Sequence, residues 1–122
     1  MPPADQRLIE AFVDHLSLER RLSPHTVTAY RQDVDALSTF LHRAGSSLGQ
    51  ARYPQLRRWL AHLTTRGYAR ASIARKAASI RTFFAWAVRR GHLDSNPASL
   101  LSHPTPVNRL PIVLKQTEAT QL

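Results

Sequence analysis

Apolar residues recur every three or four positions in four segments of this 122-residue chain, a spacing that is typical of amphipathic helices. Alternating apolar and polar residues, which would indicate strands, are nearly absent. The chain is therefore predicted to be all-α. The predicted helices span about 5–20, 23–44, 54–66 and 70–90, and a short further turn of helix begins at Asn96-Pro97. We expect two antiparallel helix pairs in a compact four- to five-helix bundle.

Residues that favour helix ends support these boundaries. Ser23 followed by Pro24 is a strong start signal, because serine caps the first amides and proline suits the first helical position. Asp5 is placed to cap the first helix, and a glycine follows each of the last three helices. The predicted core consists of Leu8, Phe12, Leu16, Val27, Tyr30, Val34, Leu37, Leu41, Leu56, Leu60, Leu63, Ile73, Ala77, Ile80, Phe84, Ala87 and Val88, with Phe83 at its edge and both tryptophans as packing groups.

The composition changes after Leu101. Residues 103–111 contain three prolines and show no helical periodicity, which indicates an extended linker. Thr117-Glu118 then looks like the cap and first turn of another helix, as expected of a piece of a longer protein. We divide the chain into a helical domain (1–101), a linker (102–110) and the start of a further domain (111–122).

Charge is segregated along the chain. No acid occurs in residues 36–93, which carry eleven lysines and arginines, whereas residues 1–35 sum to −2 and the whole chain to +9. A field of one sign repels itself unless a polyanion relieves it, so nucleic acid is the first partner to consider. There is no cysteine, no apolar run long enough to span a bilayer and no signal peptide, which favours a soluble, cytoplasmic protein without a membrane partner.

The fourth helix has a slim polar face that suits a DNA major groove. At 100° per residue, Ser72, Arg75, Ser79 and Thr82 fall opposite the apolar stripe, with small alanines beside them. Arg75 is predicted to reach a base edge, and three flanking cations are predicted to reach phosphates: Arg70, Lys76 and Arg81. A solvated surface would carry the same residues, and the segregated charge is what favours DNA.

The start of the second helix offers a second anion site. No Glu or Gln follows Ser23 at the third position, so no capping box closes over the first amides. Those amides, with His25 and the Thr26 hydroxyl, are predicted to hold a phosphate, and Thr28 continues the exposed side. An ordinary serine cap with solvated neighbours is the alternative.

Neither metal binding nor catalysis is predicted from these residues. The six histidines are dispersed, with no pair at i, i+4, so we expect no metal and no cofactor. Asp33 and Asp35 are neighbours on a helix predicted to be exposed, and no serine or threonine has a matched base. We therefore assign no catalytic residue.

Three segments carry a family resemblance: RRLSPHTVTAYRQDVDALSTFL (20–41), RASIARKAASIRTFFAWAVRRGHLDSNPASLL (70–101) and RLPIVL (109–114). In order and spacing they resemble the N-terminal, core-binding domain of tyrosine recombinases, especially the Xer type and related phage integrases. The resemblance implies a SAM-like bundle of four to five helices that grips one face of a recombination half-site, while a catalytic domain clasps the other. It implies DNA contacts from the second and fourth helices, at Ser23, His25, Thr26 and Thr28 and at Ala71, Ser72, Arg75, Ala78, Ser79 and Arg81.

The same resemblance implies that the chemistry lies elsewhere. The family's two arginines, lysine, His-x-x-Arg box and tyrosine nucleophile belong to the second domain, and no histidine here has an arginine three residues later. RLPIVLKQTEA (109–119) resembles the entrance to that domain, so residues 111–122 are interpreted as the start of a truncated catalytic domain.

For the complete enzyme the resemblance implies duplex DNA as partner, a homo- or hetero-tetramer, strand exchange without metal, and a place at the bacterial nucleoid. It also implies a role in DNA integration or chromosome-dimer resolution. Two alternatives stay open from the sequence. One is a helix-turn-helix regulator, which would need a turn of three or four residues into its recognition helix, and the loops at 45–53 and 67–70 fit that less well. The other is a helical module that binds an acidic protein.

Overall fold

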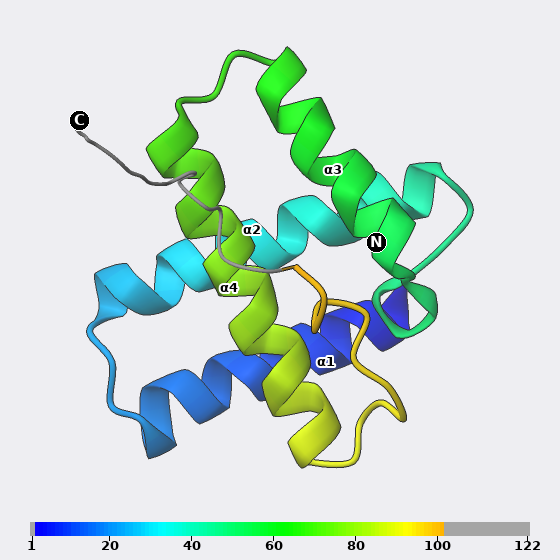
Figure 1. Ribbon diagram of the computed structural model, residues 1–122. Coiled ribbons are helices and arrows are strands. Elements are labelled where there is room, and N and C mark those ends of the chain that lie inside the picture. The colour runs from blue at the N-terminus through cyan, green and yellow to red at the C-terminus, as the bar shows by residue number, and fades with distance from the viewer. Residues whose placement is uncertain (1, 102–122) are drawn as a thin grey trace, which may run out of the picture.

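The computed structural model describes residues 2–101, and these form an all-α fold without strands (Figure 1). Its four α-helices are α1 (Pro3–Asp14), α2 (Pro24–Arg43), α3 (Tyr53–Thr65) and α4 (Arg70–Arg89). A π-helical turn, η1 (His15–Glu19), extends α1, and a short 3-10 turn, η2 (Leu48–Gln50), precedes α3. The predicted linker and the segment 111–122 lie outside the described residues.

The helices form two antiparallel pairs, as predicted. α1 and α2 contact each other and run in opposite directions, and α4 packs across both of them (Figure 1). α3 contacts α2 and α4 from the other side. α4 thus crosses α2 and then α1, and its C-terminal half packs on α1 through Phe83 and Trp86.

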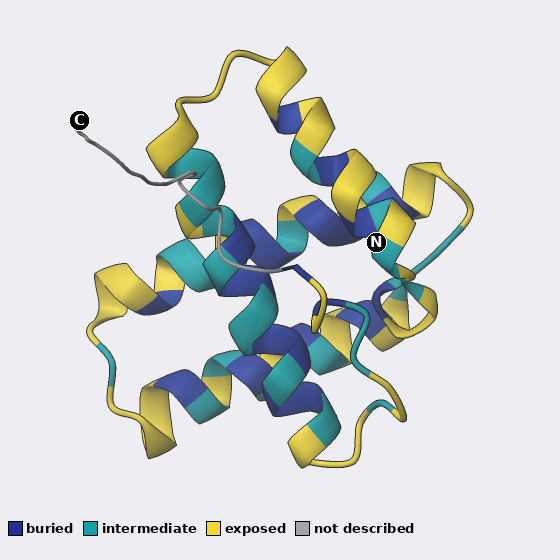
Figure 2. Cartoon of the chain, viewed as in Figure 1, coloured by how far each residue is buried: buried dark blue, intermediate teal, exposed yellow. Residues whose placement is uncertain are grey.

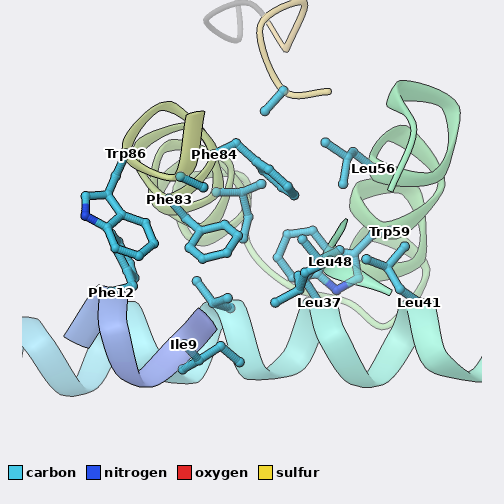
Figure 3. Close-up of a cluster of buried hydrophobic side chains, with 14 of the residues drawn as sticks. Ile9, Phe12, Leu37, Leu41, Leu48, Leu56, Trp59, Phe83, Phe84 and Trp86 are labelled. Carbon is cyan, nitrogen blue, oxygen red and sulfur yellow. The ribbon is translucent and has the colours of Figure 1, made fainter. Parts of the chain in front are cut away.

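A core rich in aromatic side chains holds the helices together (Figure 3). Phe12 of α1 lies 5.2 Å from both Phe83 and Trp86 of α4, measured between ring centroids, and it meets Phe83 edge to face. Leu37, Leu48 and Trp59 fill the space towards α3. Most of the predicted stripe is buried, and Phe83 and Trp86 are more central than the sequence indicated, because the buried stripe of α4 is wider than one apolar row.

Most helix ends follow the sequence signals. Ser23 caps α2 by accepting a hydrogen bond from the Thr26 amide at 3.2 Å. Gly45 and Gly91 adopt positive φ just after α2 and α4, a backbone conformation that favours glycine. The turn of helix predicted after Asn96-Pro97 is instead a hydrogen-bonded turn, in which the Asn96 carboxamide oxygen accepts from the Ala98 amide.

Asp5 does not cap α1, contrary to the prediction. The helix begins two residues earlier, at Pro3, and the Asp5 carboxylate points into the protein. There it accepts hydrogen bonds from the Ser38 hydroxyl at 2.5 Å and from the Leu48 amide at 3.2 Å. Asp5 therefore ties α1 to α2 and to the turn before α3.

Candidate nucleic-acid interface

A groove joins the two predicted contact regions. It lies between the start of α2 and the N-terminal half of α4, and its volume is about 370 Å³. Its lining comprises His25, Thr26, Ala29, Tyr30, Arg75, Ala78 and Ser79. Residues about fifty positions apart in the sequence thus form one surface. The first turns of α4 are exposed or half-buried, whereas the buried residues of the helix concentrate in its C-terminal half (Figure 2).

The start of α2 is exposed but less open to an anion than predicted. Ser23, His25, Thr26 and Thr28 are all exposed. The Ser23 oxygen already accepts from the Thr26 amide, so that amide is not free, contrary to the prediction. Ser23 also donates to the Thr26 oxygen at 3.0 Å, which leaves the hydrogen of the Thr26 hydroxyl available to an acceptor such as phosphate.

A buried carboxylate, Asp33 of α2, organises the α4 side of the groove. The side chain of Asp33 is only 1% exposed. It accepts from Arg75 Nη1 at 2.8 Å and more weakly from Nη2 at 3.4 Å, from Lys76 Nζ at 3.1 Å, and from Ser79 Oγ at 2.7 Å. The three donors are predicted DNA-contact residues. One carboxylate therefore fixes all of them to the same point on α2.

This cluster corrects two predictions. Asp33 is not on an exposed surface, and Ser79, which was predicted to lie on the exposed face, is 5% exposed and donates inward. The spacing held a signal for both. Asp33 lies three residues after Tyr30 and four before Leu37, and Ser79 lies four before Phe83, so each sits on a buried row of its helix.

The two cations of the cluster differ in exposure. The Arg75 side chain is 52% exposed and faces the groove, whereas that of Lys76 is 16% exposed. The Lys76 ammonium also lies 5.3 Å from the centre of the Tyr68 ring. Lys76 is therefore held on two sides, and Arg75 is the cation of this pair that has free surface towards a ligand.

The other predicted residues of α4 do not line the groove. Arg70 and Ala71 are exposed in the first turn, and Ser72, Arg81 and Thr82 are half-buried. The Nη1 atom of Arg81 is buried without a hydrogen-bond partner among residues 2–101. Arg70 is thus better placed than Arg81 to meet a phosphate.

Three acids lie in a second groove. This groove, of about 820 Å³ between α1 and α2, is lined partly by Glu10, Asp14 and Asp35, with Arg7 and Arg31. A hydrogen bond from Arg31, at 2.9 Å, lowers the pKa of Glu10, while partial burial raises the pKa of Asp35. These acids thus lie together in a groove that shares no lining residue with the groove beside α4.

No group of three or more His, Asp or Glu side chains is arranged to hold a metal ion among residues 2–101. In the same residues, no helix is long and apolar enough to cross a membrane.

Comparison with known proteins identifies the fold. Residues 9–91 match the family described as phage integrase, N-terminal SAM-like domain. The integrase from mycobacterium phage Brujita has the same fold, with a TM-score of 0.71 at 17% identity, over 90% of this chain and 36% of that one. The chain belongs to the family of phage integrase N-terminal SAM-like domains.

Curated relatives give a more specific likeness. The chain is 40% identical to tyrosine recombinase XerC of Mycobacterium sp. (strain KMS) over 116 residues, which is 93% of this chain and 39% of the relative. It is equally similar to tyrosine recombinase XerC of Mycobacterium leprae (strain TN), over 94% of this chain and 39% of that protein. The chain thus spans about two fifths of the length of the relatives it matches. These likenesses confirm the predicted family and SAM-like fold.

Proposed function

We propose that this chain is the DNA-gripping domain of a site-specific tyrosine recombinase. The observation that carries the proposal is the groove in which His25 and Thr26 of α2 meet Arg75 of α4. It lies within a chain of net charge +9 whose acids concentrate on α1 and α2. Family membership and the XerC likeness support the same function and do not favour a helix-turn-helix regulator or a protein-interaction module.

The residues take different roles in this proposal. Arg75 reads a base edge in the major groove, since an arginine can pair bidentately with guanine. Arg70, with the hydroxyls of Thr26 and Thr28, positions the phosphate backbone. Ser23 and Ser79 support these contacts without touching DNA, because both side chains already form hydrogen bonds within the protein. Ser72, Lys76, Arg81 and Thr82 complete the surface.

In the complete recombinase, the chemistry would come from a further domain. The domain described here would hold one face of the half-site, and recombinase protomers, alike or of two kinds, would assemble as a tetramer on paired sites. Strand exchange would need neither metal nor cofactor from this domain, and it would take place at the bacterial nucleoid in the cytoplasm. Integration and chromosome-dimer resolution are both reactions of this type.

Salt dependence of binding tests the proposal. This domain alone is expected to neutralise about four to six phosphates of duplex DNA. A plot of the logarithm of the binding constant against the logarithm of the salt concentration should then have a slope of about −4 to −5. Arg70→Ala should weaken binding and make the slope less steep by about one. Arg7→Ala removes the same charge from the second groove, on α1, and should leave the slope unchanged. Binding that is insensitive to salt, or equal losses in both variants, would contradict the proposal.

A further inference from the structure

We infer that Asp33 is a positioning residue that trades affinity for sequence discrimination at this groove. The inference rests on the proposed function, since it assigns a role within the DNA interface. It starts from a conflict of charge. A carboxylate beside a surface that binds a polyanion repels that ligand, so the charge alone would weaken binding. Its presence at 1% exposure, under the groove, needs a different physical reason.

The hydrogen bonds supply that reason. Asp33 holds Nη1 of Arg75 at 2.8 Å and lies 3.4 Å from Nη2, so the plane and direction of the guanidinium are set from behind. An arginine has five N–H donors in a rigid fork, and donors that do not face Asp33 are left for a ligand in the groove. With 52% of its side chain exposed, Arg75 has room to use them.

Lys76 and Ser79 fix the carboxylate in turn. Lys76 Nζ binds Oδ1 at 3.1 Å, and Ser79 Oγ donates to Oδ2 at 2.7 Å, so Asp33 has few ways to reorient. Both partners come from α4, whereas Asp33 belongs to α2. The position of Arg75 is therefore tied to the packing of two helices rather than to one flexible stem.

A fixed arginine and a free arginine recognise DNA differently. A free side chain can turn to any nearby phosphate, which gives affinity for every sequence. A fixed side chain avoids most of the entropy cost of being ordered at the base it is aimed at, and it cannot follow a phosphate elsewhere. Asp33 thus lowers affinity for random DNA through its charge and favours the matching sequence through geometry.

The test uses a pool of short duplexes of randomised sequence, because it requires no known site. The chain is incubated with the pool, the bound duplexes are sequenced, and affinity for the whole pool is measured separately. Asp33→Asn should bind the pool as tightly as the wild type or more tightly, while the base preferences among bound duplexes flatten. Asp35→Asn is the matched control. It makes the same charge change two residues away, in the groove on the other side of α2, and should retain the preferences.

Two single variants and one double variant distinguish a loss of orientation from a folding defect. Arg75→Lys keeps the charge at a half-exposed position but removes the fork, and should flatten the same preferences. Asp33→Glu keeps the charge but shifts the carboxylate, and should leave pool affinity near the wild-type value while flattening the preferences. In the double variant Asp33→Asn/Arg75→Lys, the preferences should be no flatter than in Arg75→Lys alone.

The outcomes separate the inference from the function it rests on. If the wild-type chain does not bind the pool, the proposed function itself fails. If it binds without base preference, or if Asp33→Asn keeps the preferences, DNA binding stands and the role of Asp33 is overturned. If both Asp33 variants fail to fold, the carboxylate is a stability group and the inference is likewise overturned.

Discussion

Asp5 and Asp33 are both buried carboxylates, but they have different partners. Asp5 accepts from neutral donors, the Ser38 hydroxyl and the Leu48 amide. Asp33 accepts from two cations, Arg75 and Lys76, as well as from a hydroxyl. Each ties two or more elements together. The partners of Asp5 are closed off in the interior, whereas one partner of Asp33 is half-exposed in a groove.

This difference separates a group that holds the fold from one that also orients a surface. A carboxylate among buried neutral donors can act only on the packing of α1, α2 and the turn before α3. A carboxylate that holds a half-exposed arginine acts on whatever that arginine meets. Substitutions at the two sites should therefore change different properties. At Asp5 they should lower the free energy of unfolding, and in the Asp33 cluster they should alter DNA recognition.

The largest effect is expected for Asp5→Ala. It leaves the buried Ser38 hydroxyl and Leu48 amide without their acceptor, and an unsatisfied buried polar group costs about 1–3 kcal/mol. The free energy of unfolding should fall by about 2–4 kcal/mol, measured by urea denaturation. Glu10→Ala on the same helix removes an exposed ion pair and should cost far less. Equal losses would mean that Asp5 does not hold the fold in the way its contacts indicate.

Arg75→Ala is expected to change DNA recognition, which Asp5→Ala should affect only through folding. It should narrow the difference in binding free energy between preferred and random duplexes by about 1–3 kcal/mol, since a bidentate base contact is lost. Lys76→Ala should weaken binding to both kinds of duplex alike, because a positive charge is lost while Asp33 keeps its hydrogen bonds from Arg75 and Ser79. Competition titrations measure both differences. If Arg75→Ala leaves the difference intact, the base-reading role of Arg75 is wrong.

Ser79→Ala should have a smaller effect on both properties. Asp33 keeps its cationic donors, so the loss of one hydroxyl donor should lower the free energy of unfolding by about 1 kcal/mol. Base preference should weaken less than in Arg75→Ala, because the guanidinium keeps its acceptor. Ser72→Ala, at a half-buried position on the same helix, serves as the control in urea denaturation and pool sequencing. A loss as large as that of Arg75→Ala would show that Ser79 is itself a DNA contact.

The sequence predicted the helices and most of the core because local signals determine them. Helix starts at Ser23-Pro24 and stops near glycines are set by residues next to the boundary. Asp33 and Ser79 were wrongly predicted to be exposed. A polar residue on a buried row needs hydrogen-bond partners from another helix, and no local sequence pattern predicts which residues those are. The regions at Ser23–Thr26 and Arg70–Thr82 were predicted separately. That they share a groove depends on how α4 crosses α2.

Asp35→Asn is expected to have the smallest effect on stability. Unlike Asp5→Ala, it should stabilise the protein rather than destabilise it. Partial burial raises the pKa of Asp35, so the folded protein binds this proton more tightly than the unfolded chain does. The stability that this group contributes is present below its unfolded pKa and is lost as the pH rises through its folded pKa. An asparagine does not ionise, so the variant keeps this stability at every pH. Its melting temperature should be slightly above that of the wild type at neutral pH and equal to it in acid, where Asp35 is protonated. Thermal melts across this pH range measure the difference. A variant less stable at neutral pH would mean that attraction to Arg31 outweighs burial, and that Asp35, like Asp33, is held by its cation.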